Sequence, residues 1–293
     1  MASKIMALLL SAALLLPAQT ARGADVNADN YPRVDGSTAN MPLMAALYGS
    51  TCGISADEAE AFVQASGGTG AVWRNMMHGG ADLLLVYEAP ENLKDEMRET
   101  GFLDELEITP IGRDGLVFIV NAQNPVDNLT SAQLAGIYSG AITDWFGVGG
   151  ERGPIAAFQR NEESGSQTLF LGLLMKDTEP MEAPLEYRRG AMDELIDAVA
   201  AYDGSGGAIG FSVYYYVNLM YEKPNLKLLS VDGVAPSAES IGGGEYPLVN
   251  DFYAVIRKSE PADSPARILR DRLLSDDGRR LMLESNYVPI SIR

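Results

Sequence analysis

The sequence predicts an α/β fold, because apolar segments of strand length alternate with helical segments along its 293 residues. Three strand-to-helix turns carry glycines and small polar side chains, at residues 35–42, 67–70 and 159–170. In open α/β sheets, ligands bind where strands end and helices begin. No internal repeat is visible, so a solenoid is not expected. The turns are therefore the first place to look for a binding site.

The first 23 residues have the pattern of a secretory signal peptide. Lys4 precedes an apolar run at 5–16, and Ala21 and Gly23 supply small residues at positions −3 and −1 before a cleavage at Ala24. The run is too short to cross a membrane, and no other segment approaches that length. We therefore expect an exported protein, periplasmic or secreted, that is not inserted in a membrane.

The first part of the mature chain reads as strands and helices in turn. A short strand at 34–35 leads into a helix, and the branched and apolar runs that follow are typical of buried strands. Glu88-Ala89-Pro90 ends one such run, since proline cannot continue a strand or a helix interior. The predicted elements are helices at 58–63 and 92–102 and strands at 81–87, 108–111 and 116–121.

The second part continues the alternation. A strand at 155–158 feeds the turn at 159–170, and three consecutive glycines at 242–244 predict a linker. The other predicted elements are helices at 131–138, 192–201 and 265–286 and strands at 208–216, 226–231 and 252–257.

The turn at 159–170 has the composition of an anion site. Ser164 or Ser166 can cap the helix that follows, and a helix N-terminus offers unpaired N–H groups and partial positive charge. Arg160 adds a charged donor fork that matches tetrahedral oxyanions. Glu162 would repel the ligand unless the ligand carries a proton. This combination favours hydrogen phosphate over sulfate.

The other two turns have a similar composition. Asn40 is the predicted N-cap of the first helix, with Pro42 tolerated in its first turn. Residues 67–70 precede a helix at 71–78 that Gly79 closes. Three such helix starts suggest convergence on one anion.

Composition excludes several functions. The formal net charge of −18 becomes −20 once Lys4 and Arg22 leave with the signal peptide, so nucleic acid is not an expected partner. His78 is the only histidine and Cys52 the only cysteine, which leaves a Ser–His–Asp triad or a zinc site without support. We expect no metal, no cofactor and no enzymatic activity.

Five motifs together resemble the phosphate-binding proteins of bacterial high-affinity phosphate ABC transporters. The resemblance implies a two-lobed type 2 periplasmic binding protein fold with crossover hinge strands. It implies that lobe one spans 24–114 plus 247–293 and that lobe two spans 115–246, with crossovers near Arg113-Asp114 and Tyr246-Pro247. The motifs lie at residues 35–42, 87–90, 138–145, 160–167 and 208–212.

The resemblance also implies phosphate contacts. In lobe one they fall on Asn40 and Met41, on Thr69 or alternatively Ser66, and on Glu88, which would accept the phosphate proton. In lobe two they fall on a single motif and comprise Arg160, Glu162, Ser164, Gly165 and Ser166.

The function implied is that of a monomer that captures inorganic phosphate in an interlobe cleft and delivers it to a membrane permease. Two alternatives stay open. The ligand could be another tetrahedral oxyanion, such as sulfate or molybdate. The chain could instead be a secreted hydrolase or an interaction protein on the same fold, since fold alone does not fix function.

Overall fold

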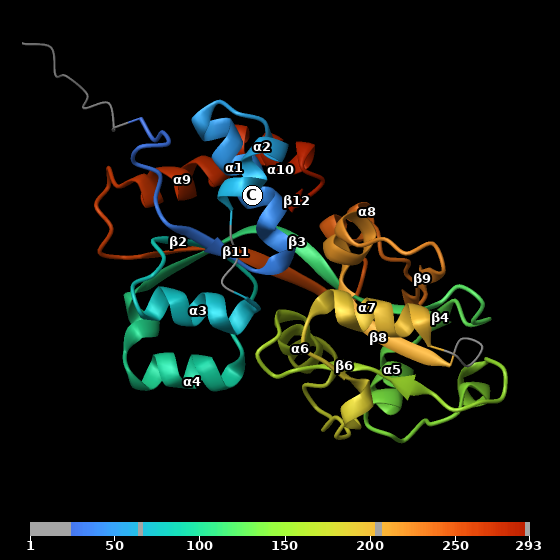
Figure 1. Ribbon diagram of the computed structural model, residues 1–293. Helices are drawn as coiled ribbons and strands as arrows, with labels where there is room; N and C mark the ends of the chain where they lie inside the picture. Colours follow the sequence, from blue (N-terminus) through green and yellow to red (C-terminus); the bar gives the residue numbers. More distant parts are fainter. Residues whose placement is uncertain (1–24, 64–66, 203–206, 291–293) are drawn as a thin grey trace, which may run out of the picture.

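The computed structural model describes residues 25–63, 67–202 and 207–290, so the signal peptide expected at 1–23 and the alternative contact Ser66 lie outside the described residues. Figure 1 shows two halves joined by one long strand, β3 (Leu106–Asn121), which runs from one into the other. We use lobe one for residues 24–114 plus 247–293 and lobe two for residues 115–246.

Lobe one is built on a mixed sheet covered by helices. Strand β11 (Val249–Arg257) runs antiparallel to β2 and to the first part of β3, whereas β1 and β2 are parallel. The remaining strands of this lobe are β1 (Val34–Gly36), β2 (Leu83–Val86) and β12 (Val288–Pro289). Its helices are α1 (Met41–Cys52), α2 (Ala56–Ala59), α3 (Thr69–Met77), α4 (Glu91–Glu99), α9 (Pro265–Leu274) and α10 (Asp276–Glu284).

Lobe two continues the same sheet through β8 (Ala208–Val213), which is antiparallel to β3 and parallel to β5 (Ala156–Ala157). Its remaining strands are β4 (Asn128–Leu129), β6 (Gln159–Arg160), β7 (Arg188–Arg189), β9 (Leu226–Leu228) and β10 (Ser230–Val231). Its helices are α5 (Ser131–Tyr138), α6 (Gly165–Leu169), α7 (Met192–Ala201) and α8 (Ala238–Gly243).

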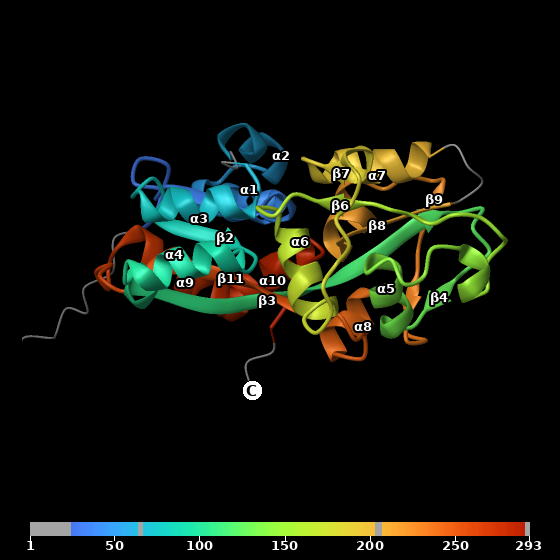
Figure 2. The same cartoon turned by 90° about the horizontal axis from the view of Figure 1, so that it is seen from below.

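Strand β3 joins the lobes, and here the sequence prediction of two separate strands was wrong. Residues 106–115 pair with β11, and residues 116–120 pair with β8. At about 3.3 Å per residue, its 16 residues span about 50 Å, and Figure 2 shows it running beneath both halves. The strand stays unbroken because its pairing partner changes from β11 to β8 while the backbone remains extended.

Two further predictions need correction. The linker expected at 242–244 is mostly helix, because α8 runs to Gly243 and ends at Gly244, whose φ of 82° suits glycine. The strand expected at 208–216 ends at Val213, and Tyr216–Met220 form a π-helical turn. The helices predicted at 131–138 and 192–201 are confirmed as α5 and α7.

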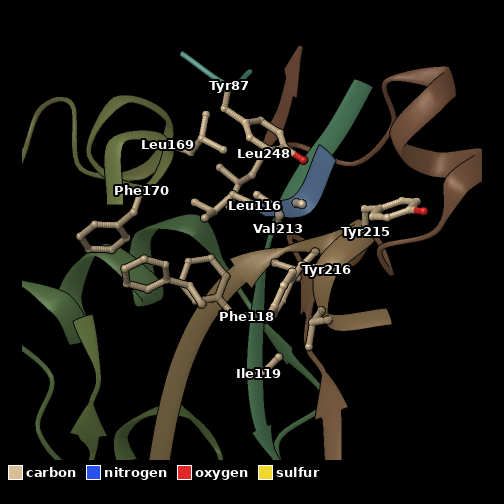
Figure 3. Close-up of a cluster of buried hydrophobic side chains, with 14 of the residues drawn as sticks. Tyr87, Leu116, Phe118, Ile119, Leu169, Phe170, Val213, Tyr215, Tyr216 and Leu248 are labelled. Atoms are coloured by element: carbon tan, nitrogen blue, oxygen red, sulfur yellow. The ribbon is translucent and has the colours of Figure 1, made fainter. Parts of the chain in front are cut away.

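A continuous apolar core runs from lobe one through β3 into lobe two. Phe170 stacks on Phe211 with ring centroids 4.5 Å apart, and Tyr138 meets Phe170 edge-on at 4.8 Å. Figure 3 shows part of this core, where Leu116 and Phe118 of β3 face side chains of neighbouring elements. This packing fixes the strand ends and helix starts that meet between the lobes.

Candidate functional site

A small cavity of about 30 Å³ lies where the two lobes meet. Helix starts and strand ends contribute its lining, as expected for an α/β sheet. From lobe one the lining comprises Ser37, Thr38, Ala39, Gly68, Thr69 and Tyr87. From lobe two it comprises Arg160, Ser164, Gly165, Ser166, Met192 and Val213.

Four buried hydroxyl groups face this cavity. Ser37 precedes the 3₁₀ turn Thr38–Asn40, and Ser164 is the N-cap of α6, yet neither side chain caps its own helix. Instead the Ser37 Oγ lies 2.9 Å from the Thr69 Oγ1, and the Ser164 Oγ lies 3.1 Å from the Ser166 Oγ. Each hydroxyl can both donate and accept, so the set can reorganise around a ligand oxygen.

Arg160 is the cationic group of the cavity. It is 7% exposed; its Nε donates to the Arg189 carbonyl at 3.2 Å and its Nη2 to the Gly190 carbonyl at 2.9 Å. Among the described residues its buried Nη1 finds no hydrogen-bond partner. Burial lowers the pKa of the Arg160 guanidinium to about 10, so the group stays cationic at neutral pH. Arg160 therefore contributes a fixed positive charge to the lining and keeps one donor nitrogen, Nη1, without a partner among the described residues.

The lobes are in contact around the cavity. A Cβ atom added at Gly165 would overlap the Thr69 Oγ1, so only glycine permits this close approach of α6 to the start of α3. The Tyr87 N–H donates to the Ser37 Oγ at 3.3 Å and holds the lobe-one turn against the end of β2. The two lobes thus approach each other closely beside the cavity.

Five of the residues singled out from the sequence come together in this lining: Thr69, Arg160, Ser164, Gly165 and Ser166. Asn40 and Met41 are outside it. Asn40 is fully buried and its Nδ2 donates to the Leu85 carbonyl at 2.9 Å, which ties α1 to β2. The predicted role of these two positions as ligand contacts therefore gains no support from the geometry.

The two glutamates also lie outside the lining. Glu88 is exposed, and its carboxylate pairs with the Lys94 Nζ at 2.6 Å on α4. Glu162 is exposed and lines a neighbouring open cleft of about 600 Å³ on lobe two, which shares Arg160 with the cavity. Side chains of acidic residues are absent from the described lining. The predicted acceptor for a phosphate proton is thus not in position.

Several lining residues were not predicted. The family resemblance placed the contacts of the first turn on Asn40 and Met41, whereas the residues of this turn that line the cavity are Ser37, Thr38 and Ala39. The signal that could have found them is the hydroxyl pair directly after Gly36 at the end of β1. Met192 had no such signal, since the parallel pairing of β6 with β7 brings the start of α7 to the cavity.

Hydrolytic machinery is not assembled here. His78 is exposed beyond the end of α3 and is absent from the cavity lining, so the described serines have no histidine base in the lining. Among the described residues, no group of three or more His, Cys, Asp or Glu side chains could hold a metal ion. The lining side chains include hydroxyl groups that can donate and accept hydrogen bonds and the charged guanidinium of Arg160.

The fold and the site together define a class: two-lobed α/β proteins with a small polar cavity between their lobes. A family model described as the PBP superfamily domain matches residues 24–270, and the chain belongs to this family.

Two curated relatives of the chain are phosphate-binding proteins. The phosphate-binding protein PstS of Bacillus subtilis is 26% identical over 178 residues, covering 60% of this chain and 55% of that protein. PstS of Borreliella burgdorferi is 26% identical over 187 residues, covering 62% and 65%. The matched part of the chain thus spans less than two thirds of the length of either relative.

A solved structure supports the fold. It is a protein from Clostridium perfringens assigned as a phosphate ABC transporter substrate-binding protein, with bound phosphate. It has a TM-score of 0.71 at 23% identity and covers 89% of this chain and 100% of its own. The likeness shows a two-lobed binding-protein fold for this chain.

Proposed function

We propose that this protein captures inorganic phosphate in the cavity between its lobes. The observation that carries the proposal is the buried Arg160, whose Nη1 is unpartnered among the described residues and which lines one small cavity with four hydroxyls. A cationic fork and several short donors are what a tetrahedral oxyanion requires.

The size of the cavity supports a small inorganic ligand. Pockets for drug-sized organic ligands are usually about 300–1,000 Å³, whereas this cavity measures about 30 Å³. It suits an ion of a few heavy atoms and is much smaller than the open cleft of about 600 Å³ that Arg160 also lines.

The partner and location follow from the relatives rather than from the site. Two relatives are named phosphate-binding proteins, and a structural neighbour is assigned to phosphate ABC transport. We propose that this chain is exported, works as a monomer and delivers phosphate to a membrane permease. Within the described ranges, no helix is both long and apolar enough to cross a membrane.

A second oxyanion is favoured by one observation, the absence of acidic side chains from the described lining. Rejection of sulfate was expected from a carboxylate that needs the phosphate proton. Hydroxyls can accept that proton too, but they donate equally well to an unprotonated anion. Sulfate is therefore the second candidate ligand, and we expect discrimination well below 10⁴-fold.

The test is calorimetric titration of the mature protein with phosphate, arsenate and sulfate in separate runs at neutral pH. Phosphate and arsenate should bind, with sulfate weaker. Tighter binding of sulfate than of phosphate would replace the proposed ligand with the second candidate. No heat and no competition from any of the three would refute an oxyanion-binding function.

A further inference from the structure

Glu163 stands in the middle of the anion-binding turn, between Arg160 and Ser164, but it does not line the cavity. Its side chain extends from lobe two to lobe one. The Arg74 Nη2 donates to the Glu163 Oε1 at 3.0 Å, and the Asn92 Nδ2 reaches the same oxygen at 3.4 Å. Arg74 belongs to α3 and Asn92 to α4, so one carboxylate meets two helices of the opposite lobe.

The backbone of Glu163 makes a third contact across the cleft. The Gly70 N–H, in the first turn of α3, donates to the Glu163 carbonyl at 3.0 Å. N–H groups in the first turn of a helix have no partner within the helix. The turn that carries Arg160 therefore gives a hydrogen-bond acceptor to an N–H group at the start of α3, the helix whose residue Thr69 lines the cavity.

The Glu163 carboxylate packs closely against Gly70, and we call this contact the Gly70 seat. A Cβ atom added at Gly70 would overlap the Glu163 Oε2 and lie 3.1 Å from its Cδ. Glycine at this position lets the carboxylate lie directly over the first turn of α3. The partial positive charge of a helix N-terminus favours a carboxylate there.

We propose that Glu163 is a latch, a positioning residue that holds the lobes closed over the ligand without touching it. The pair side chains are partly exposed, with 37% of Arg74 and 43% of Glu163 accessible, so the contact is reversible and modest in strength. A modest contact suits a cleft that must reopen to release its ligand. The ligand named here rests on the proposed function, but the latch itself does not.

The first test separates the latch from ligand contacts by kinetics. Contacts that form only after closure act on the dissociation rate and leave association nearly unchanged. Glu163→Gln keeps the shape and removes the charge, so phosphate should dissociate about fivefold faster in stopped-flow measurements. Glu151→Gln, an exposed acid of the same lobe, is the matched control and should leave the rate unaltered. A Glu163→Gln dissociation rate equal to that of the wild type would overturn the latch.

The second test changes Gly70, against which the Glu163 carboxylate packs. Gly70→Ala displaces the carboxylate while keeping both charges, so it should also speed dissociation. Glu163→Ala removes Oε2 and Cδ and leaves only the Glu163 Cβ, 3.3 Å from the added atom, so in that background Gly70→Ala should add little. Independent, additive effects of the two substitutions would show that Gly70 and Glu163 do not act together.

A measurement without ligand tests the latch independently of whether the protein binds phosphate. X-ray scattering should give a larger radius of gyration for Glu163→Gln than for the wild type without any anion, because the open form gains population. If phosphate does not bind the wild type, the proposed function is refuted, and the radius of gyration without ligand still tests whether Glu163 holds the lobes together. Identical radii would then refute it.

Discussion

A buried guanidinium is costly unless its N–H groups are bonded and its charge is met. At the residue scale, Arg160 meets part of this requirement through the Arg189 and Gly190 carbonyls, which carry no formal charge. Its Nη1 stays unpartnered among the described residues, and burial already lowers its pKa. An anion in the cavity would supply the missing acceptor and the opposite charge.

Replacing Arg160 should therefore weaken anion binding more than any change at a hydroxyl. A charged hydrogen bond contributes about 1.5–3 kcal/mol, so Arg160→Ala should raise the Kd for phosphate at least about tenfold in calorimetry. Arg160→Lys should recover only part of the loss, because an ammonium lacks the planar fork. Arg152→Ala, at an exposed arginine of the same lobe, is the control. A folded Arg160→Ala protein with unchanged affinity would remove Arg160 from the site.

For Glu88, in contrast to Arg160, we predict that substitution has little effect on anion binding. Its carboxylate pairs with Lys94 at the surface, and exposed pairs contribute about 0–1 kcal/mol. Glu88→Gln should leave the ratio of phosphate to sulfate affinity within about threefold of the wild type, since it removes only such a pair. Competition titration measures this ratio. A change above tenfold would return Glu88 to the site and restore the role that the sequence predicted.

At the scale of elements, β3 is both the link between the lobes and the carrier of a buried acid. Asp114 lies where β3 changes partner from β11 to β8. Its Oδ2 accepts from the Tyr87 hydroxyl at 2.7 Å, and its Oδ1 accepts from the Gly115 N–H at 2.7 Å and the Tyr215 N–H at 3.2 Å. Tyr87 lines the cavity in lobe one and Tyr215 follows β8 in lobe two. One carboxylate thus ties the hinge to both lobes.

The ionisation of Asp114 gives a pH prediction. Burial raises the pKa of this carboxyl to about 6 from its ordinary 3.8, against the hydrogen bonds that lower it. Between these values the folded chain holds a proton that the unfolded chain has released, so this group makes stability fall as pH rises from about 4 to about 6. Urea unfolding of wild type and Asp114→Asn should differ by a pH-dependent amount of about 3 kcal/mol across that window. Parallel stability curves would contradict the raised pKa.

The sequence predicted those elements whose signals lie within a few neighbouring residues, and it did not predict contacts between distant segments. The ranges of α5 and α7 follow from caps and apolar periodicity within a few residues, and the structure confirms them. Arg160, Ser164 and Ser166 share one turn and were found together. Pairing between distant segments has no such signal, so the unbroken β3, the place of Met192 and the surface position of Glu88 were not predicted.

At the scale of the whole molecule, the lobes meet through more than the cavity. Tyr215 of lobe two stacks on Tyr287 near the C-terminal end of lobe one with ring centroids 3.7 Å apart, and its hydroxyl donates to the Ser285 carbonyl at 2.8 Å. These contacts lie beside the hinge strand, whereas the Glu163 contacts join the turn before α6 to α3 and α4. Closure on a ligand would then couple binding to the stability of both lobes.

That coupling predicts a change in melting temperature. A ligand that binds only the folded chain stabilises it by about 2.7 kcal/mol at a hundredfold excess over its Kd. For a chain of this size, that corresponds to a rise of about 5 °C or more. Calorimetric scans in millimolar phosphate should show the rise, and scans in chloride of equal ionic strength should not. Arg160→Ala should lose most of the rise while keeping its melting temperature in chloride. A wild-type melting temperature indifferent to phosphate and to sulfate alike would count against ligand binding between the lobes, because closure on an anion cannot occur without stabilising the closed form.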